Sequence, residues 1–276
     1  MIRINRFFSQ GENDVSFGNN IVQIMIAIET AIKFGYSKVQ FDKCYLFNTC
    51  NIIISHDSKL ADTCGTFYNN NQITLGKKNI SLGHINHYDY IETCRKYISD
   101  ILNLNNKHFC KIDMEKINTT LFIHIRSGDI FETDIHPAYV QPPYSFYKFI
   151  LENNKFQQIV IVSCDKKNPC TQKLLDNYPH IIFLCSDNQM DDVSILMQAR
   201  HFVCGFGTFG YTIAYLNRNI QNVFIPDYCK NFFDHTITQF KVNKLKITNY
   251  IRVGNWTASK EQLELMINHS IDDINL

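Results

Sequence analysis

The second half of the chain alternates short apolar runs with segments in which apolar residues recur at helical spacing. The apolar runs predict strands at Thr120–Ile125, Gln158–Ser163, Ile181–Cys185, His201–Cys204 and Asn222–Ile225. The segments between them predict helices at Tyr144–Leu151, Thr171–Tyr178, Asp191–Ala199 and Thr208–Leu216. Continuously apolar strands that alternate with helices are typical of a parallel sheet covered on both faces. We therefore predict a Rossmann-type α/β domain from about Ile117 to about Tyr228.

The first half of the chain is patterned more weakly. Apolar residues follow the helical period from Phe17 to Phe34, and Gly35 stands where a left-handed residue ends many helices. A short strand is predicted at Lys38–Phe41. Residues 48–110 are rich in Asn, His and Tyr, and their pattern predicts only one further element, a helix at Tyr90–Leu102.

The length of the chain favours two domains. At 276 residues, it is long for a single core and comfortable for two. We predict an N-terminal α/β lobe over residues 1–116 and a C-terminal lobe over residues 117–250. Residues 251–276 contain a last predicted helix, Lys260–Asn268, which we expect to pack back on one of the lobes.

Composition excludes several classes of protein. The formal net charge is +1, so the molecule lacks the positive field of a general nucleic-acid binder. No apolar stretch approaches the roughly 18–20 residues of a membrane span, and the N-terminus does not resemble a signal peptide. The ten cysteines form no C-x-x-C pair. We interpret them, Cys164, Cys185 and Cys204 among them, as reduced core thiols of a cytoplasmic protein, with a disulfide framework as the alternative.

The segment Leu121–Asp129 carries the clearest chemistry. His124 and Arg126 alternate with apolar neighbours and point to one face at the end of a predicted strand. An arginine there suits a phosphate group, because its planar guanidinium can donate two parallel hydrogen bonds. Ser127 and the glycine after it let the backbone turn and offer N–H groups to the same anion. The alternative is a structural Arg126–Asp129 ion pair that closes a turn, with His124 as an ordinary core histidine.

A second candidate segment runs from Cys204 to Thr212, between a predicted strand and a predicted helix. Its glycines permit close approach of a ligand to the backbone, and Thr208 can cap the helix while offering a hydroxyl group. A helix start with free N–H groups favours anions. Gly207, Thr208 and Phe209 are therefore candidate contacts to a diphosphate. A tight turn with an ordinary cap is the alternative.

Other polar residues follow predicted strands or precede the first helix. The N-terminal loop contains the carboxylates Glu12 and Asp14, and Gly18 and Asn19 enter the helix, where they could also serve only as caps. The loop 131–144 combines aromatic, polar and proline residues, as a shaped sugar-binding loop would. Candidate contacts to a ribose or nucleobase follow two strands of the second lobe, where helix capping is the alternative: Asp165 and Asp187.

These motifs resemble those of one enzyme superfamily. H-x-R-x-x-D at a strand end is similar to the H-x-R-R-x-D motif of the GDP-fucose-using α1,2-, α1,6- and protein O-fucosyltransferases. Phe17-Gly-Asn-Asn-Ile-Val-Gln23 resembles the glycine-asparagine loop of that superfamily, and Gly207-Thr-Phe-Gly210 resembles its late strand-to-helix turn. The three matches occur in the superfamily's order and cover roughly residues 10–226.

The resemblance implies a GT-B fold, with two Rossmann-type lobes of parallel sheet and a cleft between them. The N-terminal lobe would lie on the acceptor side, and the C-terminal lobe would bind the nucleotide sugar. Arg126 would hold the β-phosphate of the donor, His124 would line the donor site, and Thr208 would bond the diphosphate. Gly18 and Asn19 would approach the donor from the N-terminal lobe. Ser127 stands in place of the motif's second arginine.

The expected activity is transfer of fucose from GDP-fucose to a glycan hydroxyl, with inversion and without a metal or another cofactor. A carboxylate would deprotonate the acceptor. The candidates are Glu12, Asp14, Asp129 and Glu132, and the need to face away from the leaving group favours Asp14 or Glu12. Two alternatives stay open: a transferase that uses another GDP-, UDP- or CMP-linked sugar, and a non-catalytic nucleotide- or glycan-binding protein.

Overall fold

The computed structural model describes two compact units. It covers the chain except for residues 5–8, 12–13, 16, 34, 55–70, 76–77, 83–90, 106–108, 133–134 and 233–239. The first unit is Met1–Asn103 and the second is Leu104–Leu276. The predicted boundaries at residues 116 and 250 stay predictions.

The first unit is built around the helix α1, Phe17–Lys33. Its side chains are buried along much of its length, because apolar residues recur at helical spacing, and Gly35 follows in the left-handed region at φ 69°. This confirms the predicted helix and its stop. The short helix α2, Ile91–Ser99, contacts α1 and lies within the predicted range 90–102.

The sheet of the first unit has mixed pairing. It comprises β1 (Ile2–Ile4), β4 (Lys38–Phe41) and β5 (Asn51–Ile53) in the order β1-β4-β5. The pair β1–β4 is parallel, whereas β4–β5 is antiparallel. Two separate antiparallel hairpins are formed by β2 (Ser9–Gly11) with β3 (Asp14–Val15), and by β6 (Asn71–Leu75) with β7 (Lys78–Leu82). The described residues of this unit therefore differ from the fully parallel sheet that the sequence predicted.

The second unit contains a seven-stranded sheet in the order β10-β9-β8-β11-β12-β13-β14. Its strands are β8 (Thr120–His124), β9 (Gln158–Val162), β10 (Ile182–Leu184), β11 (His201–Cys204), β12 (Asn222–Pro226), β13 (Lys241–Ile247) and β14 (Ile274–Asn275). All neighbouring strands are parallel except β13 and β14. The chain runs outward from β8 in one direction and from β11 in the other. The switch point where ligands bind in such sheets therefore lies between β8 and β11.

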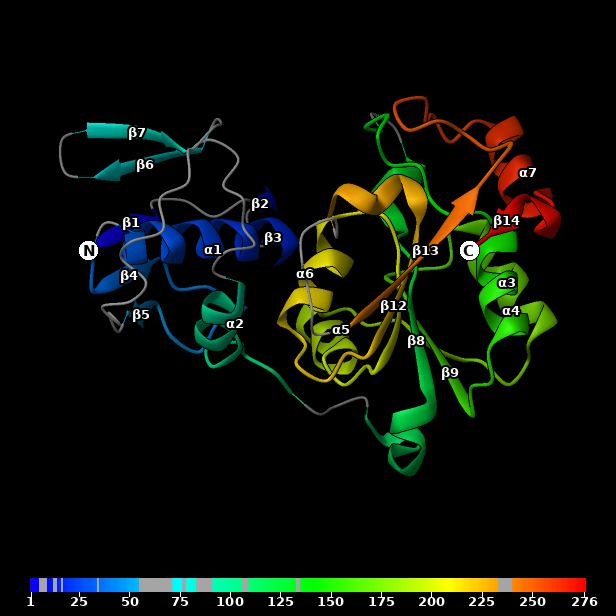
Figure 1. Cartoon of the computed structure of the whole chain (residues 1–276), viewed down its shortest axis with the longest axis horizontal. Helices are drawn as coiled ribbons and strands as arrows, with labels where there is room; N and C mark the ends of the chain where they lie inside the picture. Colours follow the sequence, from blue (N-terminus) through cyan, green and yellow to red (C-terminus); the bar gives the residue numbers. More distant parts are fainter. Residues whose placement is uncertain are drawn as a thin grey trace. The chain divides into compact units, whose positions relative to one another are not determined.

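Helices cover both faces of this sheet. In Figure 1, α3, α4 and α7 lie on one face, and α5 and α6 lie on the other. The bounds are α3 Tyr144–Asn153, α4 Pro169–Asn177, α5 Gln189–Leu196, α6 Thr208–Leu216 and α7 Lys260–Asn268. Short 3₁₀ helices occupy Phe109–Lys111, Met114–Thr119, Gly128–Phe131, Asp227–Phe232 and Ile271–Asp273. The structure thus confirms a mixed α/β unit with a mostly parallel sheet, which is compatible with the predicted Rossmann-type domain.

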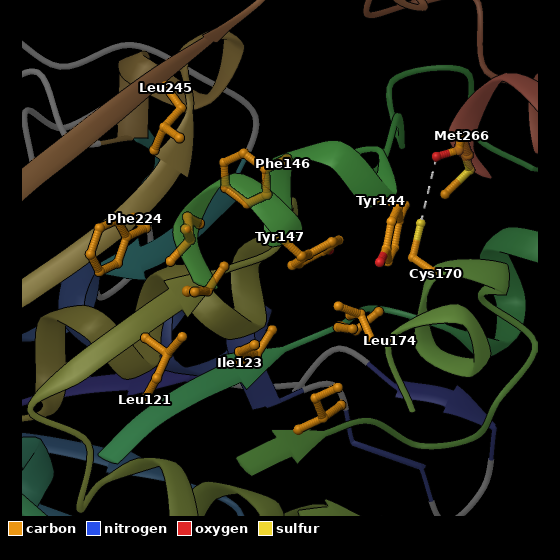
Figure 2. Close-up of a cluster of buried hydrophobic side chains, with 14 of the residues drawn as sticks. Leu121, Ile123, Tyr144, Phe146, Tyr147, Cys170, Leu174, Phe224, Leu245 and Met266 are labelled. Atoms are coloured by element: carbon orange, nitrogen blue, oxygen red, sulfur yellow. Dashed lines mark hydrogen bonds between the residues drawn. The ribbon is translucent and has the colours of Figure 1, made fainter. Parts of the chain in front are cut away.

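The core on the α3 face is apolar and continuous. Figure 2 shows Leu121 and Ile123 of β8 beneath Phe146 and Tyr147 of α3. Met266 of α7 belongs to the same cluster, so the last helix packs on this second unit. Burial of apolar surface at about 25 cal/mol per Å² makes such a cluster the main source of stability.

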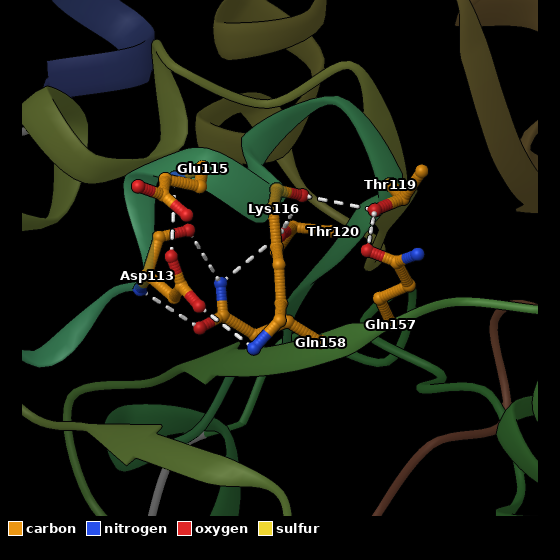
Figure 3. Close-up of polar contacts among 7 residues, drawn as sticks. All are labelled: Asp113, Glu115, Lys116, Thr119, Thr120, Gln157 and Gln158. Carbon is orange, nitrogen blue, oxygen red and sulfur yellow. Dashed lines mark hydrogen bonds and ion pairs between the residues drawn. The ribbon is translucent and has the colours of Figure 1, made fainter.

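A closed polar network holds the amino-terminal end of β8 (Figure 3). Gln158 Nε2 donates to Thr120 Oγ1 at 3.0 Å, and Gln158 Oε1 accepts from the backbone N–H of Asp113 at 2.9 Å. Thr120 Oγ1 donates to the carbonyl of Lys116 at 2.8 Å, and the Lys116 ammonium pairs with Asp113 at 2.7 Å. This network fixes the entry into the sheet and uses all four side chains in doing so.

The strands and helices predicted for the second half of the chain are confirmed, but the prediction stopped before the last strands of the sheet. Each predicted strand and helix of residues 117–228 is present, with ends that differ by a few residues. The strand β13 was missed, because its alternation of Lys and Asn with apolar residues reflects a half-exposed strand near the sheet edge rather than a buried one. The sheet therefore extends beyond Tyr228.

The interpretation of the cysteines needs correction. Cys164 and Cys185 are exposed, and only Cys204 of the three is buried. Both exposed cysteines lie just after apolar strands, at the edge where the chain leaves the sheet. Nine cysteines fall in the described part of the chain, and all nine are free thiols. Within the same part, no helix combines the length and the apolar character needed to cross a membrane.

Candidate functional site

Two segments meet at the switch point of the sheet. Cys204, the last residue of β11, is in register with His124, the last residue of β8. The next residue, Gly205, passes so close that a Cβ atom there would lie 2.9 Å from the His124 carbonyl oxygen. Only a glycine fits this approach. The segment after β8 and the β11–α6 turn are thereby held side by side at the carboxyl edge.

Arg126 is the central charged residue of this edge. Its Nη2 donates to both carboxylate oxygens of Asp129, at 3.3 and 3.0 Å. Its guanidinium carbon lies 4.2 Å from the centre of the Tyr139 ring. Its Nη1 lies 2.9 Å from the position that a Cβ atom would take at Gly207. Nε and Nη1 make no hydrogen bond within the described residues, so donors of this cation remain for a ligand.

The Arg126–Asp129 ion pair was foreseen as the structural alternative to an anion site. It is present, but it uses only one of the three guanidinium nitrogens. The Arg126 side chain is 19% exposed and that of Asp129 is 51% exposed, so the pair lies open to solvent on one side. A surface ion pair of this kind contributes about 0–1 kcal/mol. It orients the guanidinium without closing the site.

His124 is a neutral residue in this structure. Burial, and after it the charge of Arg126, lower the pKa of its imidazole to about 3. Its ring packs against that of Phe209, with 4.8 Å between the centroids. The Nδ1 atom is buried and has no hydrogen-bond partner among the described residues. His124 is therefore not the fully satisfied core histidine of the alternative interpretation.

The start of α6 differs in one respect from the prediction. Thr208 was expected to cap this helix, but the N-cap residue is Gly207, at φ 134°, and Thr208 is the first helical residue. No side chain caps the helix there. That backbone conformation is accessible to glycine and strained for other residues. Gly207, Thr208 and Phe209 thus occupy the first turn of α6, beside Arg126 and His124.

Ser127 and Asp165 belong to a local polar cluster. The Ser127 hydroxyl donates to Asp165 Oδ1, which also accepts from the backbone N–H of Lys167 at 2.9 Å. Ser127 Oγ in turn accepts from the N–H of Asn168 at 2.9 Å, and the Asn168 side chain bonds the Arg126 carbonyl at 3.0 Å. The Ser127 hydroxyl and Asp165 Oδ1 hold the β9–α4 loop against the Arg126 segment. Asp165 and Asp187 were considered as helix caps in the alternative prediction. The residues that cap α4 and α5 are instead Asn168 and Asn188.

Asp192 is a candidate that the sequence reasoning missed. It lies in the first turn of α5 and is 8% exposed, whereas Asp187 is exposed on the surface. Burial, and then the neighbouring Asp191, raise the pKa of Asp192 to about 7. Its Oδ1 has no hydrogen-bond partner among the described residues. The signal in the sequence was a pair of adjacent aspartates in an otherwise apolar helix, at the carboxyl edge of the sheet.

The remaining predicted residues fall in different places. Glu132 forms an ion pair with Lys167, close to the Asp165 cluster. Gly18 and Asn19 lie in the first turn of α1, in the first unit. Asp14 lies in β3, and its side chain is outside the description, as is the whole of Glu12. The predicted residues that the structure places around the switch point, such as Arg126, His124 and Thr208, all belong to the second unit.

In the portion of the chain that the structure describes, no three His, Cys, Asp or Glu side chains gather as metal ligands would.

A family model matches the chain. It is the model described as glycosyl transferase family 11, and it matches residues 75–252, which include β8, Arg126, Asp192 and the β11–α6 turn. No curated protein matches the chain. Because the family match covers more than half of the 276 residues, the chain belongs to glycosyl transferase family 11 and is a glycosyltransferase of the fucosyltransferase type.

Proposed function

We propose that the protein transfers fucose from GDP-fucose to a hydroxyl group of a glycan, with inversion and without a metal ion. Membership in the family implies a nucleotide-sugar donor and a glycan acceptor. The observation that carries the proposal is the position of Arg126. Its guanidinium lies beside the uncapped start of α6, at the switch point of a parallel sheet.

This arrangement suits a diphosphate leaving group. When the anomeric C–O bond breaks, negative charge grows on the departing diphosphate while the sugar becomes oxocarbenium-like. Arg126 offers Nη1 and Nε, and the first turn of α6 offers backbone N–H groups and the positive end of its dipole. Donors that are already oriented stabilise that charge without reorganisation, which is often the largest contribution to catalysis.

His124 would act in this mechanism as a neutral group. With its pKa lowered to about 3, the imidazole carries no charge at neutral pH and adds nothing to phosphate neutralisation. Ser127 stands where the motif has a second arginine, and its hydroxyl is committed to Asp165. The proposal therefore places the positive charge of the site on Arg126 and on the helix start.

Asp192 supports guanine as the nucleobase of the donor. A carboxylate can accept two parallel N–H groups, which guanine presents from N1 and its 2-amino group and which uracil lacks. Asp192 supplies a carboxyl oxygen without a partner, in the helix that follows β10 at the same edge. The raised pKa of Asp192 is consistent with a group that lacks donors in the free protein.

The acceptor side of the proposal rests on the first unit. We propose the GT-B arrangement, in which Gly18 and Asn19 approach the donor and Asp14 or Glu12 deprotonates the acceptor. Asp129 and Glu132 are weaker candidates, since each carboxylate is already engaged by a cation of the protein, Arg126 and Lys167 respectively. A cytoplasmic location is part of the same proposal, supported by the free thiols.

A panel of nucleotides tests this function. We expect GDP and GDP-fucose to raise the melting temperature of the protein, whereas UDP and CMP leave it unchanged. Arg126→Ala should strongly reduce the GDP shift and abolish the transfer of fucose. Arg218→Ala, which removes an exposed arginine of the same unit, is the matched control and should keep both.

Two results would contradict the proposal. A shift with UDP or CMP and none with GDP would assign another nucleotide sugar. Unchanged turnover in Arg126→Ala would remove the diphosphate site from the switch point.

A further inference from the structure

The loop before α3 makes a contact with Arg126 that the proposed mechanism does not use. Tyr139 lies in this loop, and its ring centre is 4.2 Å from the guanidinium carbon of Arg126. Asp129 holds the same guanidinium by its Nη2 edge. The face and one edge are thereby occupied, and Nη1 is directed at the glycine turn before α6.

The Tyr139 ring also reaches the second segment of the site. Its centroid lies 6.5 Å from that of Phe206, in an edge-to-face arrangement, and 5.3 Å from that of His136. Phe206 stands between the two glycines of the β11–α6 turn. Tyr139 therefore contacts both segments that form the candidate anion site, the one that follows β8 and the one that follows β11.

Gln141 fixes the backbone of Tyr139. Its side chain is fully buried, and Nε2 donates to the Tyr139 carbonyl at 3.0 Å. This bond sets the orientation of the amide, so Oε1 is the atom on the other side, 3.7 Å from a Cβ position at Gly205. Oε1 has no partner among the described residues.

The same loop is tied to the C-terminal part of the chain. The Pro137 carbonyl accepts from the backbone N–H groups of Gly254 and Trp256, both at 3.0 Å. The Gln141 carbonyl accepts from the Tyr250 hydroxyl at 2.9 Å. Backbone bonds on both sides of Tyr139 therefore hold its ring in place.

We propose that Tyr139 is a positioning residue, whose ring holds the Arg126 guanidinium so that Nη1 faces the diphosphate of the donor. The inference rests on the proposed function for the identity of the donor, but the contact itself involves only Arg126 and Tyr139. An aromatic face stabilises a cation beside it, more strongly when water is excluded. It also restricts a long side chain that would otherwise sample many rotamers. The Tyr139 hydroxyl makes no hydrogen bond to the described residues, so the ring alone carries the effect.

The test measures GDP and inorganic pyrophosphate binding by titration calorimetry in four single variants. Tyr139→Leu should raise the dissociation constant for both by about tenfold. Tyr139→Phe keeps the ring and should stay within about twofold of the wild type. Phe183→Leu removes the ring of another cation–π pair, with Lys166, and is the matched control that should leave binding unchanged. Arg126→Ala gives the reference for loss of the cation.

The double variant Arg126→Ala/Tyr139→Leu decides whether Tyr139 acts through Arg126. We expect it to bind no more weakly than Arg126→Ala alone, since the ring has no cation left to position. If Tyr139→Leu weakens binding by the same factor in both backgrounds, or leaves it intact in the wild type, the proposal is overturned. Should Tyr139→Leu not fold, as judged by thermal unfolding, Tyr139→Met provides the same comparison.

These outcomes separate this inference from the proposed function. If pyrophosphate binding depends on Tyr139 and Arg126 but GDP binds no better than UDP, the positioning role stands and the guanine assignment fails. If Arg126→Ala weakens GDP binding and Tyr139→Leu does not, only the positioning role is wrong. If the wild type binds neither probe, both are wrong.

Discussion

The buried polar groups at the two ends of β8 differ in whether they have hydrogen-bond partners. At the amino-terminal end, Gln158 and Thr120 are buried and form a closed network with Asp113 and Lys116. At the carboxyl end, His124 Nδ1, Arg126 Nε and Gln141 Oε1 have no hydrogen-bond partner within the described residues. The same strand thus ends in satisfied polar groups on one side and in unsatisfied ones on the other.

This difference separates structure from function. A buried polar atom without a partner costs about 1–3 kcal/mol, so native proteins leave few of them. Several such atoms beside one arginine and one glycine turn indicate a place where a ligand supplies the missing partners. The network at the amino-terminal end needs no ligand, and its contribution is to stability alone. Substitutions at the two ends should therefore change different measured quantities.

Beyond the loss of Arg126 itself, the largest expected effect comes from Gly207→Ala at the carboxyl end. A Cβ atom there would lie 2.9 Å from Arg126 Nη1, so the guanidinium has to move away from the start of α6. A misplacement on the order of 1 Å can lower kcat/KM about 10²-fold. The backbone, at φ 134°, also becomes strained, at about 1–3 kcal/mol.

A second glycine provides the control for that strain. Gly35 has φ 69°, and nothing lies within 4 Å of its Cβ position. Gly35→Ala should therefore lower the free energy of unfolding without changing kcat/KM. If steady-state transfer assays show equal losses for both variants, strain rather than the displacement of Arg126 explains the effect.

At the other end of β8, Gln158→Leu should reduce stability and leave turnover unchanged. The substitution leaves the Asp113 N–H and the Thr120 hydroxyl without their partner in a buried place. We expect the free energy of unfolding in urea to fall by about 1–3 kcal/mol. The neighbouring Gln157 is exposed, and Gln157→Leu should stay within about 0.5 kcal/mol of the wild type. A loss of kcat/KM in folded Gln158→Leu would show that the two ends are coupled.

Much of the second unit could be predicted from the sequence, because its strands are buried on both faces. Runs such as Ile159–Val162 are continuously apolar and stand between helical patterns, which leaves few alternatives to a parallel sheet. The strand β13 was not predicted, for the opposite reason. Its lysines face solvent near the sheet edge, so its composition resembles that of a surface loop.

The candidate site could be predicted residue by residue where it follows a strand, whereas the loop 131–144 was predicted only as a whole to be a binding loop. Arg126 and Gly207 were found because the carboxyl ends of parallel strands collect ligand-binding residues. Tyr139 and Gln141 lie in an irregular loop whose path depends on hydrogen bonds to residues 250–256, more than 100 positions away. No local pattern encodes such contacts. The cap of α6 was assigned to Thr208 rather than Gly207 because helix starts are uncertain by one or two residues in any sequence.

The smallest expected effect is a pH dependence of stability from His124. The pKa of its imidazole is about 3 in the folded protein and near 6.5 when the chain unfolds, so between these values the unfolded chain binds more protons. The free energy of unfolding of the wild type therefore falls as the pH decreases from about 6.5 towards 3. At neutral pH the effect is small, because the imidazole is then uncharged in both the folded and the unfolded chain.

His124→Phe isolates this contribution, since a phenyl ring can keep the contact with Phe209. In urea unfolding at several pH values, the variant should gain on the wild type as the pH falls below 6.5. Asp192→Asn should show the opposite trend, because the pKa of Asp192 is raised to about 7 and the folded protein binds the extra proton between about 4 and 7. A constant difference between wild type and His124→Phe across this range would mean that the imidazole is not held neutral by the fold. His124 at the carboxyl end of β8 would then be protonated in the folded protein even without a bound nucleotide sugar. The contrast between the two ends of β8 would be weaker than the hydrogen bonds indicate.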